Sequence, residues 1–203
     1  MWMWGKVRVG WGFGALIVLA VLAGAGPVLT MVLASALGHE LGHLAALKAA
    51  GARVTQIRLT AFGAEILADT RRLSYPREML CTLAGPAVNL ALAIFFARVV
   101  GNFEAAGANL LLGCFNLLPI PALDGGRTLH LLVSWLWDPV AADAVCRKVG
   151  LGCAGALTGL ALVLTVRYHA GLFLLLGAAG TLVPQLSVLH NPHFVKKRRG
   201  ARS

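Results

Sequence analysis

The chain has 203 residues, of which 58 % are hydrophobic and 13 % are charged, and its mean hydropathy is +0.77. These values exclude an ordinary soluble domain and indicate a chain that is embedded in a lipid bilayer. The formal net charge of +10 fits cytoplasmic loops and anionic lipid better than nucleic acid, so no nucleic-acid partner is expected.

Long apolar stretches dominate the sequence, and about 20 apolar residues are enough to cross a bilayer. Their hydropathy predicts six spans at about 11–25, 28–50, 78–100, 104–120, 148–167 and 169–187. We therefore expect an all-α polytopic membrane protein, with one six-span domain over residues 1–187 and a basic cytoplasmic tail over residues 188–203.

The basic residues predict the orientation of these spans. With six spans and both termini in the cytoplasm, Arg98 and Arg167 are the only two of the 18 Lys and Arg residues that face outside. Positive charge concentrates in cytoplasmic loops, so this asymmetry favours a multi-pass integral membrane protein with both ends cytoplasmic.

The second predicted span contains His39-Glu40-Leu41-Gly42-His43. On a helix the two histidines project from one face, where both imidazoles can bind one Zn²⁺, and Glu40 stands beside them as a candidate general base. Ionisable residues inside a span are costly and normally mark a functional site. Two alternatives remain at this point, a helix-packing cluster of hydrogen-bonded histidines and a zinc-transport site.

The segment between the second and third spans differs from its neighbours. Residues 54–60 alternate polar and apolar side chains, and Phe62-Gly63 supplies a turn before a further apolar run. This pattern predicts a β-hairpin at the cytoplasmic membrane surface. An interfacial loop without function is the alternative.

A catalytic zinc ion keeps three protein ligands, and Asp124 is the best candidate for the third. Pro119 and Pro121 stop the fourth span ahead of it, and two glycines follow it directly. At a rise of about 1.5 Å per residue, His43 and Pro119 lie roughly 22 and 21 Å along their spans. Both therefore fall in the cytoplasmic half of the bilayer, where we expect one zinc ion per chain, held by His39, His43 and Asp124.

Three motifs, taken in order, give the chain a resemblance to a known family. The H-E-x-x-H at His39 to His43, the G-P-x-x-N at Gly85 to Asn89 and the N-x-x-P-x-x-x-L-D-G at Asn116 to Gly125 resemble those of the site-2 proteases, the intramembrane zinc metalloproteases of peptidase family M50. The run Phe115–Ile120 is most similar to the stage IV sporulation protease branch, here without the nucleotide-sensing CBS domain that its members often carry.

This resemblance implies a zinc metalloendopeptidase that cleaves a membrane-associated substrate in or next to the bilayer, as in regulated intramembrane proteolysis. The sporulation branch cleaves a pro-sigma factor, and inhibitory membrane proteins are a further expected class of partner. The alternatives are a branch that cleaves anti-sigma factors or signal-peptide remnants, a zinc-binding transporter, and a non-catalytic binder of membrane segments.

Substrate contacts are expected along the hairpin, because an exposed strand edge captures an extended peptide through main-chain hydrogen bonds. The candidates there are Ile57, Leu59, Phe62 and Gly63. The resemblance adds Asn116 as a polar contact to the substrate backbone. For Asn89, a buried amide that ties helices together is the favoured interpretation.

Overall fold

The computed structural model describes residues 2–4, 7–22, 24, 26–60, 63–168 and 180–182. The chain forms two compact units, Met1–Leu117 and Leu118–Ser203, each with its own packed helices. The elements of the first unit are β1 (Trp2–Trp4), β2 (Val7–Val9), α1 (Trp11–Leu22), α2 (Gly26–Ala49), β3 (Arg53–Thr60), β4 (Gly63–Asp69), α3 (Tyr75–Phe95), the π-helix η1 (Phe96–Val100) and α4 (Phe103–Asn116).

The first unit contains a four-stranded sheet in the order β1-β2-β3-β4. β3 and β4 form the predicted antiparallel hairpin, with Ile57 opposite Ile66, and a bulge interrupts the register between Val54 and Gln56. β2 adds to the other side of β3 in parallel, and β1 pairs with β2. The two N-terminal strands were not predicted, and they leave β1 and β4 as the edge strands of the sheet.

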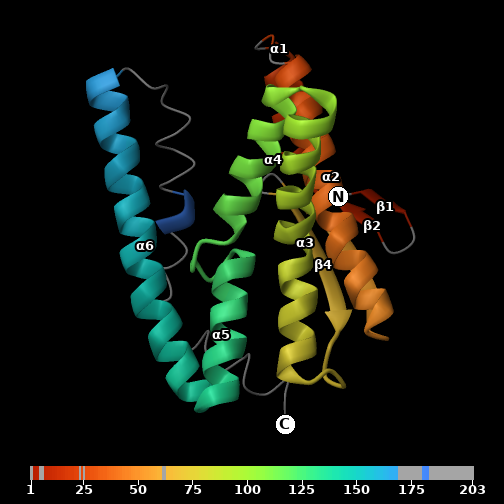
Figure 1. Ribbon diagram of the computed structural model, residues 1–203, viewed down its shortest axis with the longest axis vertical. Coiled ribbons are helices and arrows are strands. Elements are labelled where there is room, and N and C mark those ends of the chain that lie inside the picture. Colours follow the sequence, from red (N-terminus) through yellow and green to blue (C-terminus); the bar gives the residue numbers. More distant parts are fainter. Residues whose placement is uncertain are drawn as a thin grey trace. The chain divides into compact units, whose positions relative to one another are not determined.

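Helices α2, α3 and α4 pack against one another and form the core of the first unit (Figure 1). The close contact of α2 with α3 requires Gly42, where an added Cβ would lie 2.8 Å from the carbonyl oxygen of Ala84. Asn89 and Asn109 are fully or almost fully buried in this core, with exposed fractions of 0 % and 2 %. A polar pair therefore lies at the centre of the bundle.

The ends of α3 and α4 follow from their local sequences. Ser74 precedes α3, and Pro76 occupies its first turn, where a missing backbone N–H costs little. Gly101, at a φ of 73°, ends η1, since this left-handed backbone suits glycine. The side chain of Asn102 then caps α4 by accepting a hydrogen bond of 2.9 Å from the backbone N–H of Ala105.

The second unit is built from α5 (Asp124–Leu136) and α6 (Pro139–Tyr168), which pack as a helical hairpin. Asp138 starts α6 by accepting hydrogen bonds from the backbone N–H groups of Val140 and Ala141, at 2.7 and 2.9 Å. The sequence predicted a span over 148–167, whereas α6 begins at Pro139. Helix α5 was not predicted as a separate element.

Within the described part of the chain, three helical segments are long and apolar enough to cross a membrane: Gly26–Ala49, Tyr75–Val100 and Pro139–Arg167. They correspond to the second, third and fifth predicted spans. The first and fourth coincide with α1 and α4, which have 12 and 14 residues, and the sixth lies mostly outside the described residues. The total of six spans, like the single domain over 1–187, stays a prediction.

Candidate metal centre

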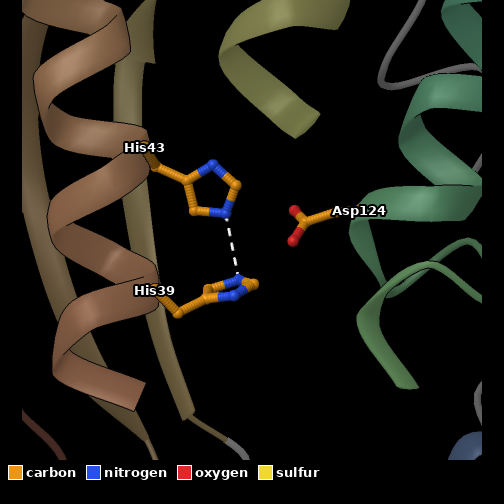
Figure 2. Close-up of side chains that lie close together, drawn as sticks. All are labelled: His39, His43 and Asp124. Carbon is orange, nitrogen blue, oxygen red and sulfur yellow. Dashed lines mark hydrogen bonds between the residues drawn. The ribbon is translucent and has the colours of Figure 1, made fainter. Parts of the chain in front are cut away.

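His39 and His43 lie one turn apart on α2, and Figure 2 shows both imidazoles projecting from the same side of that helix. Their Nε2 atoms are 3.1 Å apart, and their ring planes are almost perpendicular, at 82°. His39 is buried, with 5 % of its surface exposed, and His43 is half-buried. The predicted pairing of the two histidines is therefore present.

A chain of amide hydrogen bonds sets the proton position on His39. The carbonyl of Ala105 accepts from Nδ2 of Asn109, whose Oδ1 accepts from Nδ2 of Asn89 at 2.9 Å. The same Nδ2 also donates to the carbonyl of Ser35 at 3.1 Å. The Oδ1 of Asn89 is thereby left as an acceptor 2.6 Å from Nδ1 of His39, so Nδ1 carries the proton and donates it.

His43 is oriented in the same way by the backbone of α3. Its Nδ1 lies 2.9 Å from the carbonyl oxygen of Cys81, which only accepts hydrogen bonds. Nδ1 of His43 therefore also carries its proton. When both rings are neutral, each Nε2 carries a lone pair, and the two lone pairs are directed toward one common position.

This arrangement fits a divalent cation. Two lone pairs that face each other at 3.1 Å repel unless a proton or a cation lies between them. Two imidazole nitrogens bound to one tetrahedral zinc ion at about 2.0–2.1 Å stand about 3.3 Å apart, which matches the observed separation. Zinc-ligating histidines also usually donate their second N–H to an oxygen acceptor, as both do here.

Gly85 keeps the space in front of the two imidazoles open. A Cβ at this position would lie 2.7 Å from Cε1 of His43 and 2.8 Å from Nε2 of His39. Any side chain on Gly85 would therefore fill the volume into which both nitrogens point. Sequence reasoning gave Gly85 no role of its own, although the glycine of the G-P-x-x-N motif was the available signal.

Asp124 is the first residue of α5, in the second unit, and it is half-buried. His39, His43 and Asp124 form a group of side chains that could hold one metal ion. Two neutral nitrogens and one carboxylate oxygen are a donor set that suits Zn²⁺.

The position of Asp124 within its unit depends on a tight turn before α5. An added Cβ on Gly126 would clash with the carbonyl of Ile120 and lie 2.7 Å from the nitrogen of Pro121. Ile120 is fully buried, with an exposed fraction of 0 %. Gly126 is thus needed for the close approach of this turn to the first turn of α5.

The remaining predicted residues are placed as follows. Glu40 follows His39 on α2 and is half-buried. Asn116 is the last residue of α4 and donates a hydrogen bond of 3.0 Å from Nδ2 to the carbonyl of Leu112. Asn89 is the buried amide between helices that the sequence favoured, and it also positions His39.

The predicted substrate residues of the hairpin occupy different places in the sheet. Ile57 and Leu59 lie in β3, where β2 pairs with them on one side and β4 on the other. Gly63 is the first residue of β4, and Phe62 lies outside the described residues. Among the strands that the structure describes, the edge on this side of the sheet is β4, next to the strand that carries Ile57 and Leu59.

Residues 102–157 match the family model described as Peptidase family M50. The chain is 34 % identical over 156 residues to Rip3 of Mycobacterium tuberculosis, a protein whose name describes it as a zinc metalloprotease, and the match covers 70 % of this chain and 38 % of that protein. It is 28 % identical over 127 residues to the zinc metalloprotease MJ0392 of Methanocaldococcus jannaschii, covering 57 % of this chain and 37 % of the relative. The chain thus spans well under half the length of these curated relatives.

The fold is similar to that of a solved structure, the site-2 protease from Methanocaldococcus jannaschii. The two share a TM-score of 0.65 and 20 % sequence identity, over 92 % of this chain and 93 % of that one. Together with the sequence matches, this confirms the resemblance to the site-2 proteases that the three motifs predicted. The names of the sequence relatives, which describe zinc metalloproteases, support zinc as the ion that the histidine pair would hold.

Proposed function

We infer that this chain is a member of peptidase family M50 and acts as an intramembrane zinc metalloprotease, hydrolysing a peptide bond in or next to the bilayer. The observation that carries this inference is the pair of imidazoles on α2. Both give their Nδ1 protons to oxygen acceptors of α3 and direct their Nε2 lone pairs to one point. His39, His43 and Asp124 would hold the zinc ion there.

Bound zinc supplies Lewis acidity, which favours the loss of a proton from water and polarises the scissile carbonyl. Glu40, which neighbours His39 on the same helix, accepts the proton of the attacking water on its carboxylate and delivers it to the leaving amine. Asn89 and the Cys81 carbonyl hold the imidazoles in the tautomer that leaves Nε2 available. No other titratable group is required for this reaction.

The substrate is proposed to bind as an added strand. Peptide bonds in a helix are hydrogen-bonded internally, so the substrate has to unwind locally before it can be hydrolysed. β4 is an edge strand, and β3 and β4 contact α2, the helix that carries both histidines. The backbone of β4 would pair with the unwound segment, while Ile57 and Leu59 support it from β3 and Gly63 begins the edge.

The basic residues and one sequence run suggest the orientation in the membrane and the substrate. We propose both termini in the cytoplasm and the reaction in the cytoplasmic half of the membrane, following the distribution of basic residues. The similarity of Phe115–Ile120 to the sporulation branch favours a pro-sigma factor as the substrate. Asn116, at the end of α4, would contact the substrate backbone.

Cleavage assays with the purified full chain test this function. The substrates are a pro-sigma segment, a single-span anti-sigma segment and a helical single-span peptide without known cleavage. Cleavage that a chelator abolishes and added zinc restores is expected for the pro-sigma segment. Cleavage of the anti-sigma segment alone would reassign the branch and keep the chemistry, whereas zinc flux into vesicles that persists in Glu40→Gln, without any cleavage, would favour the transporter.

A further inference from the structure

A cavity of about 440 Å³ lies in the first unit, away from the histidines, where α2 ends and α3 begins. Four arginines line it: Arg53, Arg71, Arg72 and Arg77. Asp69, at the end of β4, is the one acidic residue in the lining. This volume falls within the range of about 300–1,000 Å³ that is typical of small-ligand sites.

The acid is already neutralised by one of these arginines. Arg71 donates from Nε and Nη2 to the two carboxylate oxygens of Asp69, at 2.9 and 2.8 Å. This two-armed pairing holds the pKa of Asp69 well below its usual value, so the carboxylate stays ionised and remains bound to Arg71. With four arginines and one aspartate, the lining of the cavity keeps a net positive charge.

The guanidinium groups of Arg53, Arg72 and Arg77 make no hydrogen bond or ion pair to any residue that the structure describes. All three are exposed and border the same hollow. Guanidinium groups gathered around one space repel one another, and a bound anion relieves this repulsion. A guanidinium also matches the oxygens of a phosphate group through paired N–H donors.

The position of the cavity relative to the apolar helices indicates which kind of anion it would bind. Both neighbouring helical segments, Gly26–Ala49 and Tyr75–Val100, are long and apolar enough to cross a membrane. Residues 50–53 follow the first directly, and residues 69–73 precede the second. The cavity therefore lies where two such segments leave the hydrocarbon, which is the level of the lipid head groups.

We propose that this arginine-lined cavity binds the phosphate group of an anionic phospholipid. The site is independent of the metal centre and of the proposed proteolysis. Its ligand is held by Arg53, Arg72 and Arg77, with Arg71 committed to Asp69. A bound lipid would hold the loop between β4 and α3 at the membrane surface. It would thereby reduce the motion of the edge strand β4.

Native mass spectrometry of the purified full chain tests this proposal, with phosphatidylglycerol and phosphatidylcholine as probes. The wild type is expected to bind phosphatidylglycerol preferentially. The double variant Arg72→Gln/Arg77→Gln should weaken this binding about 25-fold, because each basic residue near an anionic lipid contributes about fivefold. Arg98→Gln, at the other end of the Tyr75–Val100 segment, makes the same kind of charge change and should leave the affinity unchanged.

A second variant separates loss of the site from loss of the fold. Asp69→Asn releases Arg71 and removes the competing carboxylate, so it should tighten phosphatidylglycerol binding, an effect that unfolding cannot produce. Inorganic phosphate serves as the competing probe and is expected to displace the lipid only at far higher concentration. The proposal would be overturned if the wild type bound both lipids equally or if Arg98→Gln lost as much affinity as the double variant. It would also be overturned if Asp69→Asn bound the lipid more weakly, or if phosphate displaced the lipid at an equal concentration.

Discussion

The side-chain oxygen of Asn89 lies 2.6 Å from Nδ1 of His39, and both residues are buried. This hydrogen bond joins residues 50 positions apart in the sequence and links the metal centre to the core of the bundle. Asn109 and Ser35 hold Asn89 in place in turn. The interhelical polar network thus determines which nitrogen of His39 is available to a metal.

Replacing Asn89 should weaken zinc binding. In Asn89→Leu the Nδ1 proton loses its acceptor, and the ring is free to rotate or change tautomer. We expect a loss of 10- to 100-fold in zinc affinity, as is typical for residues that orient metal ligands. Competition with a calibrated chelator measures this affinity.

Asn102→Ala is the matched control for Asn89. It removes an asparagine that caps α4, at a cost of about 1 kcal/mol in stability, and it leaves the histidines untouched. An equal loss of zinc affinity in both variants would show that general destabilisation, and not the orientation of His39, is responsible.

Glu40→Gln should separate zinc binding from catalysis. The amide keeps the shape of the side chain and cannot accept the proton of the attacking water. We expect unchanged zinc content and a fall in the cleavage rate of 10²- to 10⁴-fold or more, measured with the purified chain and a peptide substrate. Glu104→Gln, an exposed acid in the first turn of α4, should retain both properties. Undiminished cleavage by Glu40→Gln would rule out its proposed role.

Gly85→Ala should abolish zinc binding through sterics alone. Its methyl group would occupy the space in front of the Nε2 atoms of His39 and His43. Gly107→Ala is the control, because a Cβ there meets no atom within 4 Å among the described residues and alanine favours the helix. Zinc content by elemental analysis is expected to fall only in Gly85→Ala. Full zinc content in that variant would contradict the proposed location of the ion.

Proline in β4 should block the capture of substrate. Successive backbone N–H groups point to opposite edges of a strand, so Ile66→Pro and Leu67→Pro each remove a donor from a different side. One of the two variants is expected to retain zinc and the sheet while losing most of its cleavage activity. The β4 edge is not the substrate site if neither variant loses cleavage activity while it retains zinc.

Hydropathy and motif spacing predicted much of the first unit. The second and third spans agree with α2 and with α3 plus η1, because both segments are long and predominantly apolar. The alternation over 54–60 correctly predicted β3 and its hairpin with β4. Local patterns were sufficient in these places because each element is specified by its own residues.

The missed elements depend on contacts that a local pattern does not contain. Helix α5 is amphipathic, and Arg127 and His130 interrupt its hydropathy, so it was not recognised as a helix. His130 lies 3.0 Å from Asp143 of α6, which gives it a partner within its own unit. The strands β1 and β2 have three residues each, and pairing with β3 stabilises them. The supports of the histidines also come from distant parts of the sequence. The Cys81 carbonyl lies 38 residues from His43. Ser35 and Asn109 lie 54 and 20 residues from Asn89, which they hold.

X-ray absorption at the zinc edge, on the wild type and on Asp124→Ala, tests the metal centre most directly. We predict one zinc ion per wild-type chain, with two imidazole nitrogens and at least one protein oxygen among its ligands. In Asp124→Ala the protein oxygen should be missing and the zinc affinity strongly reduced. An identical ligand shell and affinity in both proteins would show that Asp124 does not bind the metal and would contradict the proposed hydrolase.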